Sequence, residues 1–133
     1  MLQITSYARV VDNSGGKIVK CLKVKKGSGS VAYGLIGNFL VVSIMSSWIE
    51  PSDGGIKSKK HAAMLREFCY ALVIRSRHGL TRRDGCVVRF GENDVLLLNR
   101  DGTPKGTRVL GFVPFELRFL KCMRAVSLSS GTI

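Results

Sequence analysis

The residue types that most often carry catalysis are few in this chain and stand apart from one another. The two histidines, His61 and His78, lie in basic stretches that lack a neighbouring carboxylate and nucleophile. The nine acidic residues are scattered and form no paired-carboxylate pattern. The run Gly27-Ser28-Gly29-Ser30 lacks both the lysine and the helix that a phosphate-binding loop needs, so it predicts a hairpin tip. The sequence therefore predicts no catalytic residue and no enzyme.

Cysteine is the other residue type with reactive or metal-binding chemistry. The four cysteines, Cys21, Cys69, Cys86 and Cys122, form no Cys-x-x-Cys pair, and their spacing is irregular. A structural zinc site normally shows such pairs, so we predict no metal and no cofactor. Each cysteine stands in an apolar stretch, where a free thiol behaves as a small buried hydrophobe. Buried thiols in a reducing compartment are therefore predicted, with a disulfide or a metal site as the alternatives.

Cationic side chains are the most distinctive chemical groups of the chain. Lys and Arg number 21 against 9 Asp and Glu, which gives a net charge of +12. From Lys57 to Arg89 there are nine basic residues and two acids, and from Lys17 to Lys26 there are five lysines and no acid. Such a one-sided surplus repels itself in a compact fold unless an anionic partner neutralises it. Nucleic acid is the predicted partner, with an anionic membrane surface or an acidic protein as alternatives.

The same residues indicate how the nucleic acid would be bound. Aromatic residues make up 8% of the chain and do not alternate with the basic residues of the expected strands. Contact with the backbone and shape of folded RNA is therefore predicted over base stacking. Arg82 and Arg83 precede the turn Asp84-Gly85, where two guanidinium groups can reach adjacent phosphates.

The apolar pattern argues against a membrane partner. The most apolar run, Leu35 to Ile49, is interrupted by polar residues and is shorter than the roughly 20 residues of a membrane-spanning helix. The first residues lack the apolar core of a signal peptide and an Arg-rich amphipathic stretch. We expect a targeting peptide to be absent or already removed.

The elements that position the charges are predicted to be short strands. Apolar runs of four to eight residues, separated by turn-forming residues, occupy 8–11, 18–24, 39–45, 70–75, 86–90 and 95–98. Their spacing favours a small antiparallel barrel or sandwich. Two helices are expected, a short one over 61–68 and a second that begins near Pro114. In the second, Phe115, Phe119 and Met123 are spaced one turn apart.

A set of ordered motifs resembles a known family. They are Val11-Asp12-Asn13-Ser14-Gly15, Cys21-Leu22-Lys23-Val24, Arg82-Arg83-Asp84-Gly85, Val88-Arg89-Phe90, Val95-Leu96-Leu97-Leu98-Asn99, Pro104-Lys105-Gly106-Thr107-Arg108-Val109-Leu110-Gly111 and Glu116-Leu117-Arg118, followed by Lys121, Met123, Arg124 and Val126-Ser127-Leu128. Together they closely resemble the large-subunit ribosomal protein fourteen family of bacterial or organellar type, from Met1 to about Leu128.

The resemblance implies a mainly β fold with a five-stranded antiparallel β-barrel, a β-hairpin extension and a short C-terminal helical region. It implies one domain over 1–133, with a divergent loop insertion at about 46–66 and a helical segment at about 112–128. The implied function is structural: the protein binds large-subunit ribosomal RNA and helps form an intersubunit bridge during translation. The implied partners are large-subunit rRNA, small-subunit rRNA at the bridge, and neighbouring large-subunit proteins of the nineteen and three types, with no small-molecule substrate.

By the same resemblance, eleven basic residues are candidates for RNA contact. They are Lys17, Lys23, Arg75, Arg82, Arg83, Arg89, Lys105, Arg108, Arg118, Lys121 and Arg124. For Arg89 and Arg118, a structural ion pair is the alternative role.

Three departures from the family pattern bear on the cellular compartment of the protein. Trp48, Ile49 and Glu50 replace the usual residues of the insertion, and Trp48 and Ile49 are expected to pack on a further protein or an RNA element. The run 112–115 differs at the entry to the helix, and the last residues, 129–133, keep no family identity. The insertion, the cysteines and a mean hydropathy of +0.15 favour a mitochondrial ribosome, with the bacterial cytoplasm or a plastid as alternatives. A free RNA-binding barrel, acting as a chaperone or translational regulator, is the alternative function.

Overall fold

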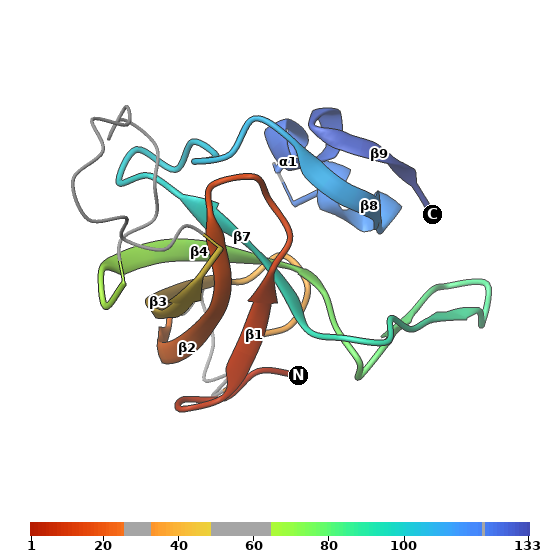
Figure 1. Ribbon diagram of the computed structural model, residues 1–133. Coiled ribbons are helices and arrows are strands. Elements are labelled where there is room, and N and C mark those ends of the chain that lie inside the picture. The colour runs from red at the N-terminus through yellow and green to blue at the C-terminus, as the bar shows by residue number, and fades with distance from the viewer. Residues whose placement is uncertain (26–32, 49–64, 121) are drawn as a thin grey trace.

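Five strands close into a barrel in the computed structural model, which describes residues 1–25, 33–48, 65–120 and 122–133 (Figure 1). The order around the barrel is β1 (Tyr7–Val10), β2 (Gly16–Val24), β3 (Phe39–Ser47), β4 (Phe68–Arg75) and β7 (Asp94–Leu98). Successive pairs are antiparallel, but β1 and β7, which close the barrel, run parallel. The predicted mainly β, five-stranded barrel is confirmed, with this one parallel pairing as a difference.

The barrel forms because its strands alternate apolar and polar side chains. In β2, Val19, Cys21 and Val24 are buried, and the lysines between them face outward. Strand β7 is buried at every residue, because Leu97 faces the barrel core whereas Leu96 and Leu98 contact a second apolar cluster outside it. A strand covered on both faces is expected to be apolar throughout.

The chain after the barrel provides that outer cover. It forms β8 (Val109–Val113), the 3-10 helix η1 (Phe115–Arg118), α1 (Met123–Ser127) and β9 (Ser129–Thr132), with β8 and β9 paired in parallel. Leu117 and Ala125 from this C-terminal cover pack in the outer cluster. The short C-terminal helical region is confirmed. The single helix expected from Pro114 to Met123 is wrong, because it is divided into two short pieces that each bury one apolar side.

A hairpin arm, residues 77–93, projects from one end of the barrel (Figure 1). It contains β5 (Leu80–Thr81) and β6 (Val87–Val88), which confirms the predicted hairpin extension. Its turn is held by a hydrogen bond from Arg82 N to Cys86 O (2.8 Å) and by one from Cys86 N to the Asp84 carboxylate (2.9 Å). Gly85 supplies the positive φ of 84° that this turn requires.

Two sequence expectations are wrong where the structure describes them. Leu65 and Arg66 form a turn and β4 begins at Phe68, so the helix expected over 61–68 is absent from its described part, and residues 61–64 lie outside the description. Three of the four free cysteines are buried as predicted, but Cys86 is exposed, because the thin hairpin arm has no core to cover it. No helix among the described residues is long and apolar enough to cross a membrane.

Candidate nucleic-acid interface

Two of the sequence motifs, far apart in the chain, bind each other beside the barrel. Asn13 Oδ1 accepts hydrogen bonds from the main-chain N–H groups of Thr107 (2.7 Å) and Arg108 (3.1 Å). Asn13 Nδ2 donates to Thr107 Oγ1 (2.8 Å). Gly106 permits this approach, because a Cβ there would lie 2.8 Å from Asn13 Oδ1. The loop is thereby fixed at two main-chain positions, and it presents the exposed Arg108 side chain from a rigid base.

Asp12 extends the hydrogen bonding of the barrel beyond the end of β1. Its Oδ2 accepts a hydrogen bond from Leu97 N (2.9 Å), and its Oδ1 accepts from Ser14 N (3.0 Å) and from the Ser14 hydroxyl. Burial raises the pKa of this carboxyl, although the hydrogen bonds from Ser14 and Leu97 oppose the shift. Asp12 is therefore a structural residue of the loop base rather than part of an exposed acidic site.

The structure uses Arg75 inside the protein. Arg75 Nη1 donates to Asp94 Oδ2 (2.7 Å), and the two side chains are 11% and 7% exposed. Arg75 Nε donates to the carbonyl of Phe112 (2.7 Å), and Nη2 donates to the carbonyl of Leu110. One guanidinium thus joins β4, β7 and β8, and the RNA-facing role predicted for Arg75 does not fit these contacts.

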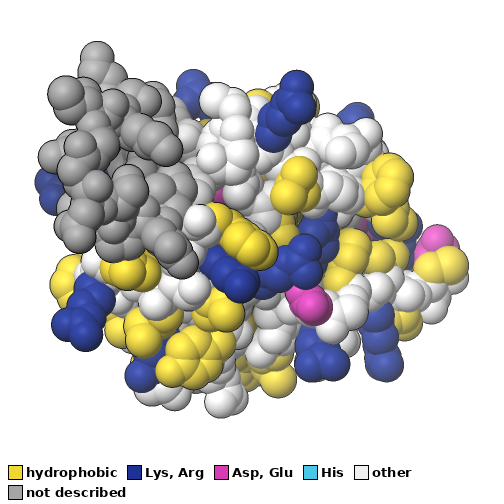
Figure 2. Space-filling view, in the orientation of Figure 1, with side chains coloured by type: hydrophobic (Ala, Val, Ile, Leu, Met, Phe, Trp, Pro, Cys, Tyr) yellow, Lys and Arg dark blue, Asp and Glu magenta, His cyan; other side chains and the backbone are white. Residues whose placement is uncertain are grey.

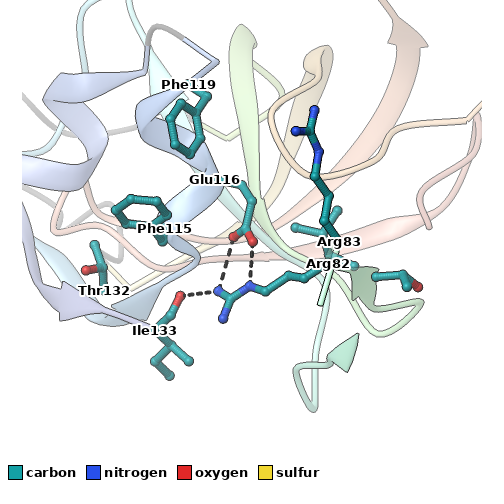
Figure 3. Close-up of a pocket in the computed structure, with 9 residues that line it drawn as sticks. Arg82, Arg83, Phe115, Glu116, Phe119, Thr132 and Ile133 are labelled. Atoms are coloured by element: carbon teal, nitrogen blue, oxygen red, sulfur yellow. Dashed lines mark hydrogen bonds and ion pairs between the residues drawn. The ribbon is translucent and has the colours of Figure 1, made fainter. Parts of the chain in front are cut away.

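Arg82 is likewise directed inward, toward the C-terminal cover (Figure 3). Its Nε lies 2.6 Å from Glu116 Oε1, and its Nη2 donates to Glu116 Oε2 (3.3 Å) and to the main-chain oxygen of Ile133 (2.7 Å). These hydrogen bonds lower the pKa of Glu116 and raise that of Arg82. We name this arrangement the Arg82 clamp, because it ties the turn of the hairpin arm to Glu116 and Ile133, which follow the barrel in the chain.

Arg83, the next residue, points away from Glu116 in the same view (Figure 3) and is exposed. On the returning strand of the arm, Arg89 is also exposed, and its side chain crosses Gly79, where a Cβ would lie 2.6 Å from Arg89 Cγ. Neither arginine forms an ion pair with a described carboxylate. Among the described residues, the arginines that form ion pairs are Arg9, Arg75 and Arg82, rather than Arg89 and Arg118.

The remaining candidates lie in different surroundings. Lys105 is partly covered, and its Nζ lies 3.3 Å from Glu67 Oε2. Lys23, Arg118 and Arg124 are exposed, whereas Lys121 lies outside the described residues. Figure 2 shows Lys and Arg side chains spread over the face that carries β1 and β2, with few carboxylates among them.

Aromatic rings accompany two of these candidates, Lys17 and Arg118, and two further lysines. Four rings lie beside cationic groups: Lys17 on Trp48 (4.4 Å to the ring centroid), Lys20 on Tyr7 (6.0 Å), Lys25 on Tyr70 (4.0 Å) and Arg118 on Phe115 (5.2 Å). Tyr7 and Lys20 are directly opposite each other in the β1–β2 register. Sequence reasoning missed these pairs, because it compared neighbours along one strand rather than across two.

Among the described residues, no group of three or more His, Cys, Asp or Glu side chains is placed to hold a metal ion.

A family model described as ribosomal protein L14p/L23e matches residues 1–133. The chain is also 38% identical, over 134 residues, to the large ribosomal subunit protein uL14 of Carsonella ruddii (strain PV), and the alignment covers 100% of both proteins. The chain therefore belongs to the L14p/L23e family of ribosomal proteins.

Proposed function

We propose that this protein, a structural component of the large ribosomal subunit by family, binds large-subunit ribosomal RNA through the hairpin arm and the loop 104–108. The family is one of structural proteins and not of known enzymes. The observation that carries the proposal is the outward position of Arg83 and Arg89 on an arm that the Arg82 clamp holds to the body. Arg108, which lies on the loop that Asn13 binds, adds a further exposed cation to the proposed RNA contacts.

Rigid presentation matters because a phosphate contact is more favourable when no side-chain or loop entropy is lost on binding. The arm is tied to the C-terminal cover by Arg82, and the loop is tied to the barrel by Asn13. Lys23, Arg118 and Arg124 are exposed and are assigned to further phosphate contacts. Arg75 is assigned a structural role instead.

The proposal is tested by replacing both outward arginines of the arm with alanine. Binding of the Arg83→Ala/Arg89→Ala variant to a large-subunit rRNA transcript is measured over a range of salt concentrations. Each lost phosphate contact should reduce the slope of log affinity against log salt by about one. The Arg83→Lys/Arg89→Lys variant keeps the charge and should keep the slope. An unchanged slope in a folded alanine variant would contradict the assignment.

The intersubunit bridge, with small-subunit rRNA as partner, belongs to the same proposal and is supported by family membership. Contacts with large-subunit proteins of the nineteen and three types are proposed on the same ground. Most of the 46–66 insertion lies outside the described residues, so the proposal does not depend on its structure. Large subunits that carry the alanine variant are expected to sediment with small subunits less completely than wild-type subunits do.

We assign the protein to a mitochondrial ribosome on the basis of its divergent insertion and its cysteines. A bacterial cytoplasmic or plastid ribosome is the alternative, and the relative with 38% identity is bacterial. Fractionation of the source cells, followed by sedimentation of the ribosomes from each compartment, separates the three. The same sedimentation tests the alternative function, because a free RNA chaperone or regulator would remain above the large-subunit peak.

A further inference from the structure

A groove beside β1 has a composition that the proposed phosphate contacts do not explain. It has a volume of about 620 Å³ and is lined by residues of β1, the start of β2 and the base of the hairpin arm, together with Trp48, which follows β3, and Leu110 of β8. Its principal side chains are Tyr7, Arg9, Lys17, Ile18, Trp48 and Arg77. We call it the Trp48 groove. It combines two aromatic rings with three cations, and pockets of this size accommodate small organic ligands.

The two rings are open to solvent. Trp48 is 69% exposed and Tyr7 is 57% exposed, and neither belongs to the two apolar clusters of the protein. The main chain of Trp48 is anchored to the barrel, because its N–H donates to the carbonyl of Gly15 (2.9 Å). Lys17 lies on its ring but covers only a part of it. A large aromatic surface is therefore open to solvent without serving the core.

The charges around these rings select for an anion. Arg9, Lys17 and Arg77 carry positive charge into the groove, whereas Glu92 is the exposed carboxylate on its lining and is paired with Arg9 at 2.7 Å. Asp12 also borders the groove, but its oxygens are occupied by Ser14 and Leu97. An aromatic platform with adjoining cations is the arrangement that binds an unpaired nucleotide, whose base stacks while its phosphate is neutralised.

We propose that the Trp48 groove binds one unpaired nucleotide of ribosomal RNA, with the base stacked on Trp48 and the adjoining phosphate against Lys17 and Arg77. This rests on the proposed function, since it names the RNA feature that one part of the surface recognises. An acidic protein segment would also meet the charges, but it offers no flat base for the exposed ring. The groove adds a base-stacking contact to an interface otherwise made of phosphate contacts.

The single tryptophan of the chain makes the proposal directly measurable. The full-length protein is titrated with a short, unstructured oligoribonucleotide while Trp48 fluorescence is recorded. A matched oligomer in which the bases are removed but the sugar–phosphate backbone is kept serves as the control, and polyglutamate serves as the acidic-protein control. We expect quenching by the first oligomer only. Equal quenching by the abasic oligomer or by polyglutamate, or no quenching at all, would overturn the proposal.

A variant pair tests the contribution of the ring to affinity. Because Trp48 is exposed, Trp48→Ala and Trp48→Phe should both fold, which thermal unfolding checks. With a labelled oligomer, Trp48→Ala should bind roughly 5- to 150-fold more weakly, the effect of losing one stacked base, and Trp48→Phe should retain most of the affinity. Equal affinity of all three proteins would contradict stacking.

The result of the Trp48 tests can be distinguished from the result of the Arg83/Arg89 test of the proposed function. Trp48→Ala should leave the affinity for the abasic oligomer and the salt slope for rRNA unchanged, since the hairpin arm is intact. Conversely, the Arg83→Ala/Arg89→Ala variant should still show quenching of Trp48 by the base-bearing oligomer. Loss of rRNA binding in the arm variant together with no effect of the Trp48 variants would reject the groove and keep the wider proposal.

Discussion

The arginines of this protein divide into two kinds according to what their guanidinium groups contact. Arg75 and Arg82 are bound by acceptors of the protein itself, whereas Arg83 and Arg89 face outward. Adjacent residues can therefore have different roles. Arg82 positions the hairpin arm, and Arg83 is available for a phosphate.

Replacement of Arg75 should chiefly affect stability. Arg75→Met leaves Asp94, which is 5% exposed, as a buried carboxylate without its cation, and such a break costs about 3 kcal/mol. Urea unfolding measures this loss, and the Arg75→Met/Asp94→Leu variant should recover much of it. The salt slope of rRNA binding should stay unchanged. A clear fall of that slope at full stability would restore Arg75 to the RNA-facing set.

Asp12 should be essential for the loop base. Asp12→Ala removes the acceptor of Leu97 N–H and Ser14 N–H, and buried donors without partners should lower the free energy of unfolding by about 2 kcal/mol. Asp101→Ala, which removes the same charge from an exposed turn, is the control and should have little effect. Equal stability of the two variants in urea would show that the carboxylate is not needed.

At the scale of elements, the sequence predicted the strands well where they show an alternating apolar pattern and are bounded by turn-forming residues. The runs 18–24, 39–45, 70–75 and 95–98 all lie within observed strands, because alternating burial leaves a clear pattern. Strands β8 and β9 were missed. They pair in parallel around a short helical connection, and the pattern of Ser129–Thr132 is not strongly apolar. Val109 and Val113 of β8 lie in the same buried cluster as Leu96 and Leu98, so β8 depends on packing as well as on local preference.

The candidate site was less predictable than the fold. A sequence shows that Arg75 and Arg82 are charged, but it does not show the main-chain oxygens of Phe112 and Ile133 that receive their hydrogen bonds. The sequence also does not show strand register, and it is the β1–β2 register that places Lys20 beside Tyr7. Contacts between residues far apart in the chain therefore decide which cations remain exposed to solvent.

The Arg82 clamp should make the mobility of the hairpin arm depend on pH. The pKa of Glu116 is lowered in the folded protein, so its stabilising effect is complete above the ordinary carboxyl pKa. That effect is lost as pH falls through the lowered value. Glu116→Gln should speed amide hydrogen exchange in β5 and β6 at neutral pH and remove this dependence. Glu92→Gln, which alters the exposed pair with Arg9, is the matched control and should leave exchange in β5 and β6 unchanged.

At the scale of the whole molecule, the charge surplus should weaken the free protein. With a net charge of +12, repulsion among the surface cations is screened by salt, so the Tm should rise as NaCl is added from low ionic strength. The Arg83→Ala/Arg89→Ala variant carries less charge and should show a smaller rise. A Tm that falls with added salt would mean that the internal ion pairs outweigh the repulsion.

The parallel pairing of β1 with β7 has a consequence for how the chain acquires its structure during synthesis. Val10 finds its partner only at Val95, so the first strand has an open edge until more than two thirds of the sequence has been made. Even then, Leu72, Ile74, Leu96 and Leu98 remain uncovered until the C-terminal cover arrives. Contacts between such distant residues slow folding. A nascent chain that stops after residue 98 should therefore expose an apolar sheet face that is prone to aggregate, and it should require a chaperone.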